Sequence, residues 1–272
     1  MNEQYLLRML MGENLARKAG KSALEAFKNA ELKVESKGAG DVVSEADFAI
    51  ETMVRQSLSD AFPDDYIIGE EFGGDASPQG FTWLIDPIDG TVNFTRRLSY
   101  FCVSIALLSD GKTVAAWIFD PVLDELFHAD PQGHAYLNHQ PIACASASDF
   151  ADAVISLGFS SRHDQGLGGI IVASLFAAGT ENRRLGAGAL SLAHAAAGRV
   201  DAYIEPHMNA WDAVGGLYIA ACAGAVVCDY IGAGGLAHGA PVYAASPAIS
   251  SKLHALLPPP FADISLLLPA KA

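Results

Sequence analysis

The acidic residues of one short segment have a spacing that could hold a metal ion. The segment reads WLIDPIDGTVNF and carries Asp86 and Asp89 where an apolar, strand-like run ends. The proline after Asp86 keeps the chain extended, and Gly90 can adopt turn conformations that other residues resist, so both carboxylates can point into one space. The Ile88 carbonyl lies between them in the sequence and can join them. Carboxylate and carbonyl oxygens are the ligands that hard divalent cations prefer, so the segment predicts a divalent-metal site.

The turn that follows Asp89 suits an anion. It exposes the N–H groups of Gly90 and Thr91 near an expected helix start, and such groups favour a phosphate. Acidic residues can hold metal ions that in turn hold phosphate, so the acidity of the chain does not argue against phosphate chemistry.

Three further acids stand where a fold would not need them. Glu70 follows a short apolar run, and Asp212 begins an apolar helix. Asp47 lies three residues after Ser44, the expected N-cap of a helix. Taken singly, each has an ordinary interpretation as a solvated acid, a helix-dipole acid or a capping residue. Only their combination with the preceding segment indicates a site.

Hydrophobic periodicity predicts the elements that would position these acids. In the first half we expect two helices, a Gly-rich loop between them, two short strands and an antiparallel meander. These elements cover 3–30, 35–41, 44–62, 66–69, 81–85 and 101–136, with meander breaks at Asp110-Gly111, Asp124 and Gly133. In the second half strands alternate with helices. The strands cover 153–159, 201–205, 225–230 and 241–246, and the helices cover 165–178, a segment ending at Ala197, 211–223 and a segment starting near Pro247.

This order indicates a layered, mixed α/β (α+β) protein with two lobes. We expect residues 1–148 to form an N-terminal lobe with most of the metal ligands. Residues 149–272 form a lobe that completes the site, within one compact unit. The segment ISLLL after Pro260 has no obvious place and packs on the body or on a partner.

The composition excludes some classes of protein. The chain has 272 residues, 51% of them hydrophobic, and a formal charge of −14. It is too apolar for intrinsic disorder and lacks the basic footprint of a nucleic-acid-binding module. We expect a cytoplasmic protein without a membrane partner, because no signal peptide and no bilayer-spanning run is evident. The four cysteines are expected to be reduced core thiols, with a zinc site at Cys222 and Cys228 as the alternative.

Four strings in order carry a family resemblance: DVVSEAD, GEE, WLIDPIDGTVNF and WDAVGG. With them the chain resembles the inositol monophosphatase family of magnesium-dependent, lithium-sensitive phosphatases over almost its whole length. The resemblance implies a layered αβαβα sandwich of the sugar-phosphatase type and a homodimer. Two positions depart from the usual pattern, Cys222 in place of a common Glu and Ala225 in place of a common Gly.

The resemblance also implies roles for individual residues. The implied ligands of two or three magnesium ions are Glu70, Asp86, the Ile88 carbonyl, Asp89 and Asp212. The implied catalytic residues, which orient or activate water, are Glu70, Thr91 and Asp47, with Asp47 paired to Thr91. The implied substrate contacts are Asp89, Gly90, Thr91, Gly188, Glu205 and Asp212.

The expected activity is magnesium-dependent hydrolysis of a small phosphate monoester, with inositol-1-phosphate or a similar polyol phosphate as substrate. Two metal ions about 3.5–4 Å apart would assist attack by water. The alternatives are histidinol-phosphatase, then 3′-phosphoadenosine-5′-phosphate phosphatase or fructose-1,6-bisphosphatase, which share the metal core. A non-catalytic regulatory protein that retains the fold is the alternative from another class, and it predicts loss of metal acids, of which none is lost here.

Overall fold

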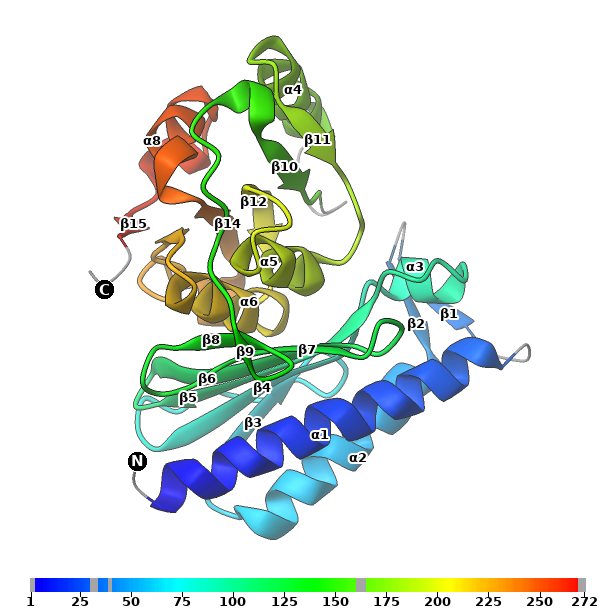
Figure 1. Cartoon of the computed structure of the whole chain (residues 1–272). Coiled ribbons are helices and arrows are strands. Elements are labelled where there is room, and N and C mark those ends of the chain that lie inside the picture. Colours follow the sequence, from blue (N-terminus) through cyan, green and yellow to red (C-terminus); the bar gives the residue numbers. More distant parts are fainter. Residues whose placement is uncertain (1–2, 30–33, 39–40, 160–164, 269–272) are drawn as a thin grey trace.

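Figure 1 shows the computed structural model of the chain, which describes residues 3–29, 34–38, 41–159 and 165–268. Two helices cover one face of a seven-stranded sheet, two more lie between this sheet and a six-stranded sheet, and two lie beyond the second sheet. In this order the helices are α1 (Glu3–Lys28) and α2 (Glu45–Ala61), α5 (Gly188–Ala196) and α6 (Ala210–Cys222), and α4 (Gln165–Ala177) and α8 (Pro247–Leu256). The predicted mixed α/β fold with αβαβα layers is confirmed.

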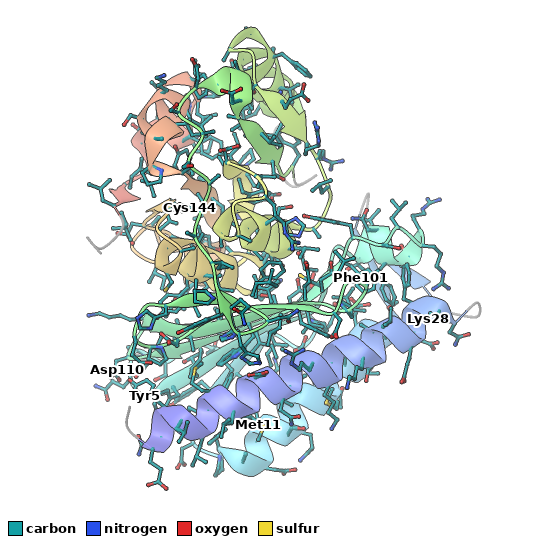
Figure 2. The ribbon with its side chains drawn as sticks, in the orientation of Figure 1. Tyr5, Met11, Lys28, Phe101, Asp110 and Cys144 are labelled. Atoms are coloured by element: carbon teal, nitrogen blue, oxygen red, sulfur yellow. The ribbon has the colours of Figure 1, made fainter. Side chains whose placement is uncertain are left out.

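The first sheet contains the predicted meander. Its strand order is β3 (Tyr66–Gly69), β4 (Phe81–Asp89), β5 (Cys102–Ser109), β6 (Lys112–Asp120), β7 (Glu125–Ala129), β8 (Ala135–Leu137) and β9 (Gln140–Pro141). Only β3 and β4 pair in parallel, and the later neighbours are antiparallel. Phe101 and Asp110, labelled in Figure 2, mark the two ends of β5. Asp110, Asp124 and Gly133 have positive φ angles, so the predicted breaks are turns.

The second sheet contains the predicted strands of the second half and two short additions. Its order is β11 (Glu181–Arg183), β10 (Val154–Leu157), β12 (Ala202–Met208), β14 (Ala240–Ala245), β13 (Val226–Cys228) and β15 (Leu266–Leu267). β10 pairs in parallel with β11 and β12, whereas the other pairs are antiparallel. β15 belongs to the segment ISLLL, so this segment packs on the body of the molecule.

Helix α1 lies close to the first sheet because it carries glycines where large aromatic rings meet it. A Cβ added at Gly12 would lie 2.5 Å from the Trp117 ring, and one at Gly20 would lie 2.2 Å from the Phe119 ring. Both rings are almost completely buried. The close approach leaves room between α1 and the sheet mainly for small side chains of the helix, such as those of Ala16, Ala19 and Ala23.

The predicted loop at 35–41 is wrong for the residues that the structure describes. Strands β1 (Val34–Gly38) and β2 (Asp41–Ser44) form an antiparallel hairpin, with Val34 opposite Ser44; residues 39–40 lie outside the described part. Strand formation depends on an available partner more than on intrinsic propensity, and here β2 supplies the partner. The strand predicted at 81–85 also continues to Asp89. Strand β11, the helix α7 (Gly235–His238) and two 3₁₀ turns at Phe150–Asp152 and Phe261–Asp263 were not predicted.

The chain passes from the first sheet to the second between Pro141 and Val154. Cys144, labelled in Figure 2, lies on this connection, and its N–H donates to the carbonyl of Ala223 over 2.9 Å. The zinc alternative is wrong within the described part of the chain, because the acid, His and Cys side chains close enough to share a metal include neither Cys222 nor Cys228. None of the described helices combines the length and the apolar character needed to cross a membrane.

Candidate functional site

A cavity of 430 Å³ opens where the first sheet, α5, α6 and β12 meet. Eighteen described residues line it, and five of them were singled out in the sequence analysis. They are Glu70, Asp89, Val92, Asn93, Leu157, Gly158, Phe159, Arg184, Gly186, Ala187, Gly188, Ser191, Tyr203, Glu205, His207, Met208, Asn209 and Asp212. Residues from both sheets therefore contribute to one space.

Two carboxylates that line this cavity, those of Glu70 and Asp212, converge with the buried carboxylate of Asp86. Each of Glu70, Asp86 and Asp212 offers an oxygen, and these oxygens all lie within 4.8 Å of one another. Glu70 directly follows the last residue of β3, and Asp86 lies next to it on β4, where the Glu70 N–H donates to the Ile85 carbonyl over 3.1 Å. Parallel strands bring their carboxyl ends to the same edge, and this explains the convergence.

The third carboxylate comes from α6, which packs on the same sheet. The Ser104 hydroxyl donates to the Trp211 carbonyl over 3.1 Å, and Ser104 lies opposite Asp86 on β5. A Cβ added at Gly215 would meet Ser104 Oγ at 3.4 Å, so the first turns of α6 lie directly on the strand. This contact fixes Asp212 beside the ends of β3 and β4.

The cluster concentrates negative charge in a buried place. Asp86 is only 1% exposed. Burial, the charges of Glu70, Asp212 and Asp89, and a hydrogen bond with Asp212 raise the pKa of Asp86 well above its ordinary value. A hard divalent cation would relieve this repulsion, and the oxygen-only donor set fits magnesium.

Asp89 faces the cavity but is held by a different element. Its Oδ1 accepts the Gly188 N–H over 3.0 Å, and its Oδ2 accepts the Leu190 N–H over 3.2 Å. Both donors lie at the start of α5, where backbone N–H groups lack partners within the helix. Burial raises the pKa of Asp89, although these hydrogen bonds oppose the rise. The structure therefore brings Asp89 to the cavity wall, outside the group of three convergent oxygens.

Gly90 and Thr91 form the predicted helix start. Gly90 has φ 91° and precedes the short helix α3 (Thr91–Thr95). A Cβ there would lie 2.9 Å from the Cβ of Ala187, so both conformation and space require glycine. The Thr91 hydroxyl donates to the Ile88 carbonyl over 3.0 Å, which leaves that carbonyl one further lone pair.

Glu205 also lines the cavity. Its Oε2 accepts the Tyr203 hydroxyl over 2.5 Å, and burial raises the pKa of Glu205 to about 8. Gly188 borders the same place, because a Cβ there would lie 2.7 Å from Met208 Cε and 2.9 Å from the Tyr203 hydroxyl. Glu205 and Tyr203 thus offer hydrogen-bonding groups to a polar ligand in the cavity.

Comparison with known proteins agrees with this arrangement. A model of the inositol monophosphatase family matches residues 8–264. The chain belongs to the inositol monophosphatase family. It is 38% identical over 221 residues to the Nus factor SuhB of Xylella fastidiosa, with 80% of each chain covered. It is 37% identical over 221 residues to the inositol-1-monophosphatase of Mesorhizobium japonicum, with 80% of this chain and 83% of that protein covered.

Solved structures share the fold. The crystal structure of the extragenic suppressor protein suhB from Bartonella henselae superimposes with a TM-score of 0.85 at 31% identity. The match covers 93% of this chain and 99% of that one. The chain is therefore a member of a phosphatase family over nearly its full length.

One relationship expected from the inositol monophosphatase resemblance is not formed. Asp47 is fully buried and caps its own helix, with Oδ2 accepting the N–H of Ser44 over 2.9 Å and its hydroxyl over 2.5 Å. Its Oδ1 has no hydrogen-bond partner among the described residues, so it does not bond to Thr91. The capping box holds Asp47 at the start of α2 and explains the difference. Burial raises the pKa of Asp47 to about 6.

Several residues that line the cavity were not found from the sequence. Tyr203 lies two residues before Glu205 on the same strand, and the period of two that places both side chains on one face could have identified it. Gly158 gave no signal, although a Cβ there would lie 2.1 Å from Glu205 Oε2. Asn93 joins the two halves of the chain, since its amide donates to the carbonyls of Tyr100 and Leu185.

Proposed function

We propose that this protein hydrolyses a small phosphate monoester and depends on magnesium to do so. The observation that carries the proposal is the convergence of the Glu70, Asp86 and Asp212 carboxylates on one another. A phosphate monoester resists hydrolysis because the ester and hydroxide are both negative, and a site that binds cations beside the phosphate overcomes that repulsion.

Glu70, Asp86 and Asp212 would be the first ligands of magnesium. Asp89 and the Ile88 carbonyl would complete the predicted ligand set for two or three ions. Bound magnesium would stabilise charge on the phosphoryl oxygens and lower the pKa of a bound water.

The chain's own groups would orient the two reactants. The N–H groups of Gly90 and Thr91 would bind the phosphate at the start of α3, next to the carboxylates. Glu70 would hold the attacking water, and Thr91 would orient it. Asp47, whose Oδ1 has no partner, is proposed to support the same water, although it bonds to Ser44 and not to Thr91.

The part of the cavity around Glu205 supports the proposal that the alcohol part of the substrate is a polyol. Glu205 and Tyr203 offer a carboxyl group and a hydroxyl that can exchange hydrogen bonds with ring hydroxyls. Two glycines border Glu205, and a Cβ at either Gly158 or Gly188 would crowd it. Inositol-1-phosphate or a similar polyol phosphate is the proposed substrate, and histidinol phosphate is the next candidate.

The test compares kcat/KM for inositol-1-phosphate, histidinol phosphate, 3′-phosphoadenosine-5′-phosphate and fructose-1,6-bisphosphate, with and without magnesium. We expect phosphate release only with magnesium and the highest value for inositol-1-phosphate. In Glu205→Gln, the ratio of kcat/KM for inositol-1-phosphate to that for 4-nitrophenyl phosphate should fall about tenfold, because the aryl ester has no ring hydroxyls. A higher value for another ester would reassign the substrate.

A regulatory binding function is the second candidate, because several relatives are named Nus factor SuhB. A chain with that function alone would release no phosphate from any ester in the same panel, with or without magnesium. Because relatives carry the name Nus factor SuhB, the expectation that this chain has no nucleic-acid partner remains a prediction.

Three further properties are proposed from the family alone: inhibition by lithium, a homodimer in solution and a cytoplasmic location. Inhibition of the phosphatase assay by lithium and a sedimentation measurement of mass test the first two.

A further inference from the structure

Glu70 lies on a tight turn that leaves the end of β3. The turn is closed by two reciprocal backbone hydrogen bonds, from the Gly69 N–H to the Gly73 carbonyl over 3.1 Å and from the Gly73 N–H to the Gly69 carbonyl over 3.0 Å. Glu70, Glu71 and Phe72 form the tip. The direction of the Glu70 side chain therefore depends on how this tip is held.

The tip is held by a carboxylate from α2. Glu51 is completely buried, and its Oε2 accepts the Glu71 N–H over 2.8 Å while its Oε1 accepts the Phe72 N–H over 3.3 Å. A Cβ added at Gly69 would lie only 1.9 Å from Glu51 Oε1. The carboxylate thus occupies the inside of the turn, in contact with its backbone.

Arg55 completes this arrangement one helical turn later. Its Nε donates to Glu51 Oε1 over 2.7 Å, so the buried carboxylate has a charged partner. Its guanidinium also donates to the Gly73 carbonyl. Glu51 therefore binds the donors of the turn, and Arg55 binds one of its acceptors.

The Glu51–Arg55 ion pair is not needed merely to fill the space inside the turn. A buried ion pair loses its hydration, and an apolar pair of similar volume is often as stable or more stable. Carboxylate hydrogen bonds to two consecutive N–H groups instead fix the orientation of a short backbone segment. That segment directly follows Glu70, whose oxygen lies in the group formed with Asp86 and Asp212.

We propose that Glu51 is a positioning residue for Glu70: by holding the N–H groups of Glu71 and Phe72, it keeps the Glu70 carboxylate aimed at Asp86 and Asp212. The proposal rests on the proposed function, in which Glu70 binds a divalent cation. Groups that orient metal ligands typically change metal affinity by about 10–100-fold when they are removed.

The test measures Mn²⁺ binding to the full-length protein at 25 °C by electron paramagnetic resonance, with circular dichroism on the same samples. In Glu51→Gln, the amide nitrogen would face a backbone N–H, and we expect the Mn²⁺ dissociation constant to rise about 10–100-fold with an unchanged spectrum. Asp60→Asn on the exposed end of the same helix is the matched control, with an expected change within about twofold.

A second set of variants tests whether the position of the Glu51 carboxylate inside the turn is what matters. Gly69→Ala displaces Glu51 from the turn and should weaken Mn²⁺ binding as Glu51→Gln does. In Glu51→Ala with Gly69→Ala, the added methyl has space, so the double variant should bind Mn²⁺ no more weakly than Glu51→Ala.

Unchanged Mn²⁺ affinity in Glu51→Gln would overturn the proposal. Loss of the native spectrum in Glu51→Gln would also overturn it, because Glu51 would then serve the fold and not the aim of Glu70. If the unmodified protein itself binds no Mn²⁺, the proposed function fails, and that result is distinct from both of these.

Discussion

At the scale of single residues, the three convergent carboxylates lower the stability of the fold but are required for the proposed activity. Burial, and then the like charges around it, raise the pKa of Asp86 well above the usual range. Such a group lowers stability as the pH rises above the ordinary carboxyl value, because the unfolded chain loses its proton more readily. The cluster therefore lowers stability, which is the trade expected if the proposed function requires these carboxylates to bind a cation.

Asp86→Asn tests this trade. The amide can keep the hydrogen bond from the Ile88 N–H and removes one charge, so in EDTA at pH 8 we expect the unfolding free energy to rise by about 1 kcal/mol. In magnesium, kcat/KM should fall at least ~100-fold, since cation stabilisation is worth several kcal/mol. Urea unfolding and phosphate release measure the two effects. Lower stability in EDTA would show that charge repulsion does not dominate at Asp86.

Glu205 predicts a stability effect that depends on pH. The folded-state pKa of about 8 exceeds the ordinary value of 4.5, so the stabilising protonated form is fully present below pH 4.5 and is lost as the pH rises through 8. Glu205→Gln should therefore match the unmodified protein near pH 4.5 and become progressively more stable than it up to pH 8. Urea unfolding of both proteins in EDTA across this range measures the difference. A difference that does not change with pH would contradict the raised pKa.

At the scale of elements, the strand ends were predictable and the distant contacts were not. The apolar runs before Glu70 and Asp86 predicted two strands that end in acids, and the parallel register of β3 and β4 places those ends together. The contact between Asp89 and the start of α5 joins residues about a hundred positions apart, so no local pattern could predict it. The Asp47–Thr91 pair came from the resemblance alone, and the capping box explains why the structure does not form it.

The position of α1 on the first sheet depends on Gly12. Alanine is a better helix former, yet a Cβ at Gly12 would overlap the buried Trp117 ring, so we expect Gly12→Ala to lower the unfolding free energy by about 1–3 kcal/mol. Gly169 on α4 is the matched control, because a Cβ there meets no atom of the described residues within 4 Å. Gly169→Ala should raise stability by about 0.5–1 kcal/mol. Equal effects at both positions in urea unfolding would show that the close approach of α1 is not tight.

At the scale of the whole molecule, the three convergent carboxylates come from both halves of the chain. Glu70 and Asp86 belong to the first sheet, whereas Asp212 belongs to α6 in the second half. The amide of Asn93, the carboxylate of Asp89 and the N–H of Cys144 make further bonds between the halves. We propose that residues 1–148 and 149–272 act as one catalytic unit.

This organisation predicts one cooperative unfolding transition. Tryptophan fluorescence, which reports Trp83 and Trp117 in the first half and Trp211 in the second, and far-ultraviolet circular dichroism should give the same midpoint. Magnesium at about 100 times its dissociation constant should shift that single transition upward by about 2.7 kcal/mol. Two transitions, of which magnesium moves only one, would contradict a shared unit.

The position of bound cations tests the central claim most directly. Crystals grown with Mn²⁺ and measured at its absorption edge would locate each ion by anomalous scattering. We predict an anomalous peak within coordination distance of Glu70, Asp86 and Asp212, and no peak there in crystals of Asp86→Asn. A protein that releases phosphate with Mn²⁺ but has no peak among these three carboxylates would contradict the account.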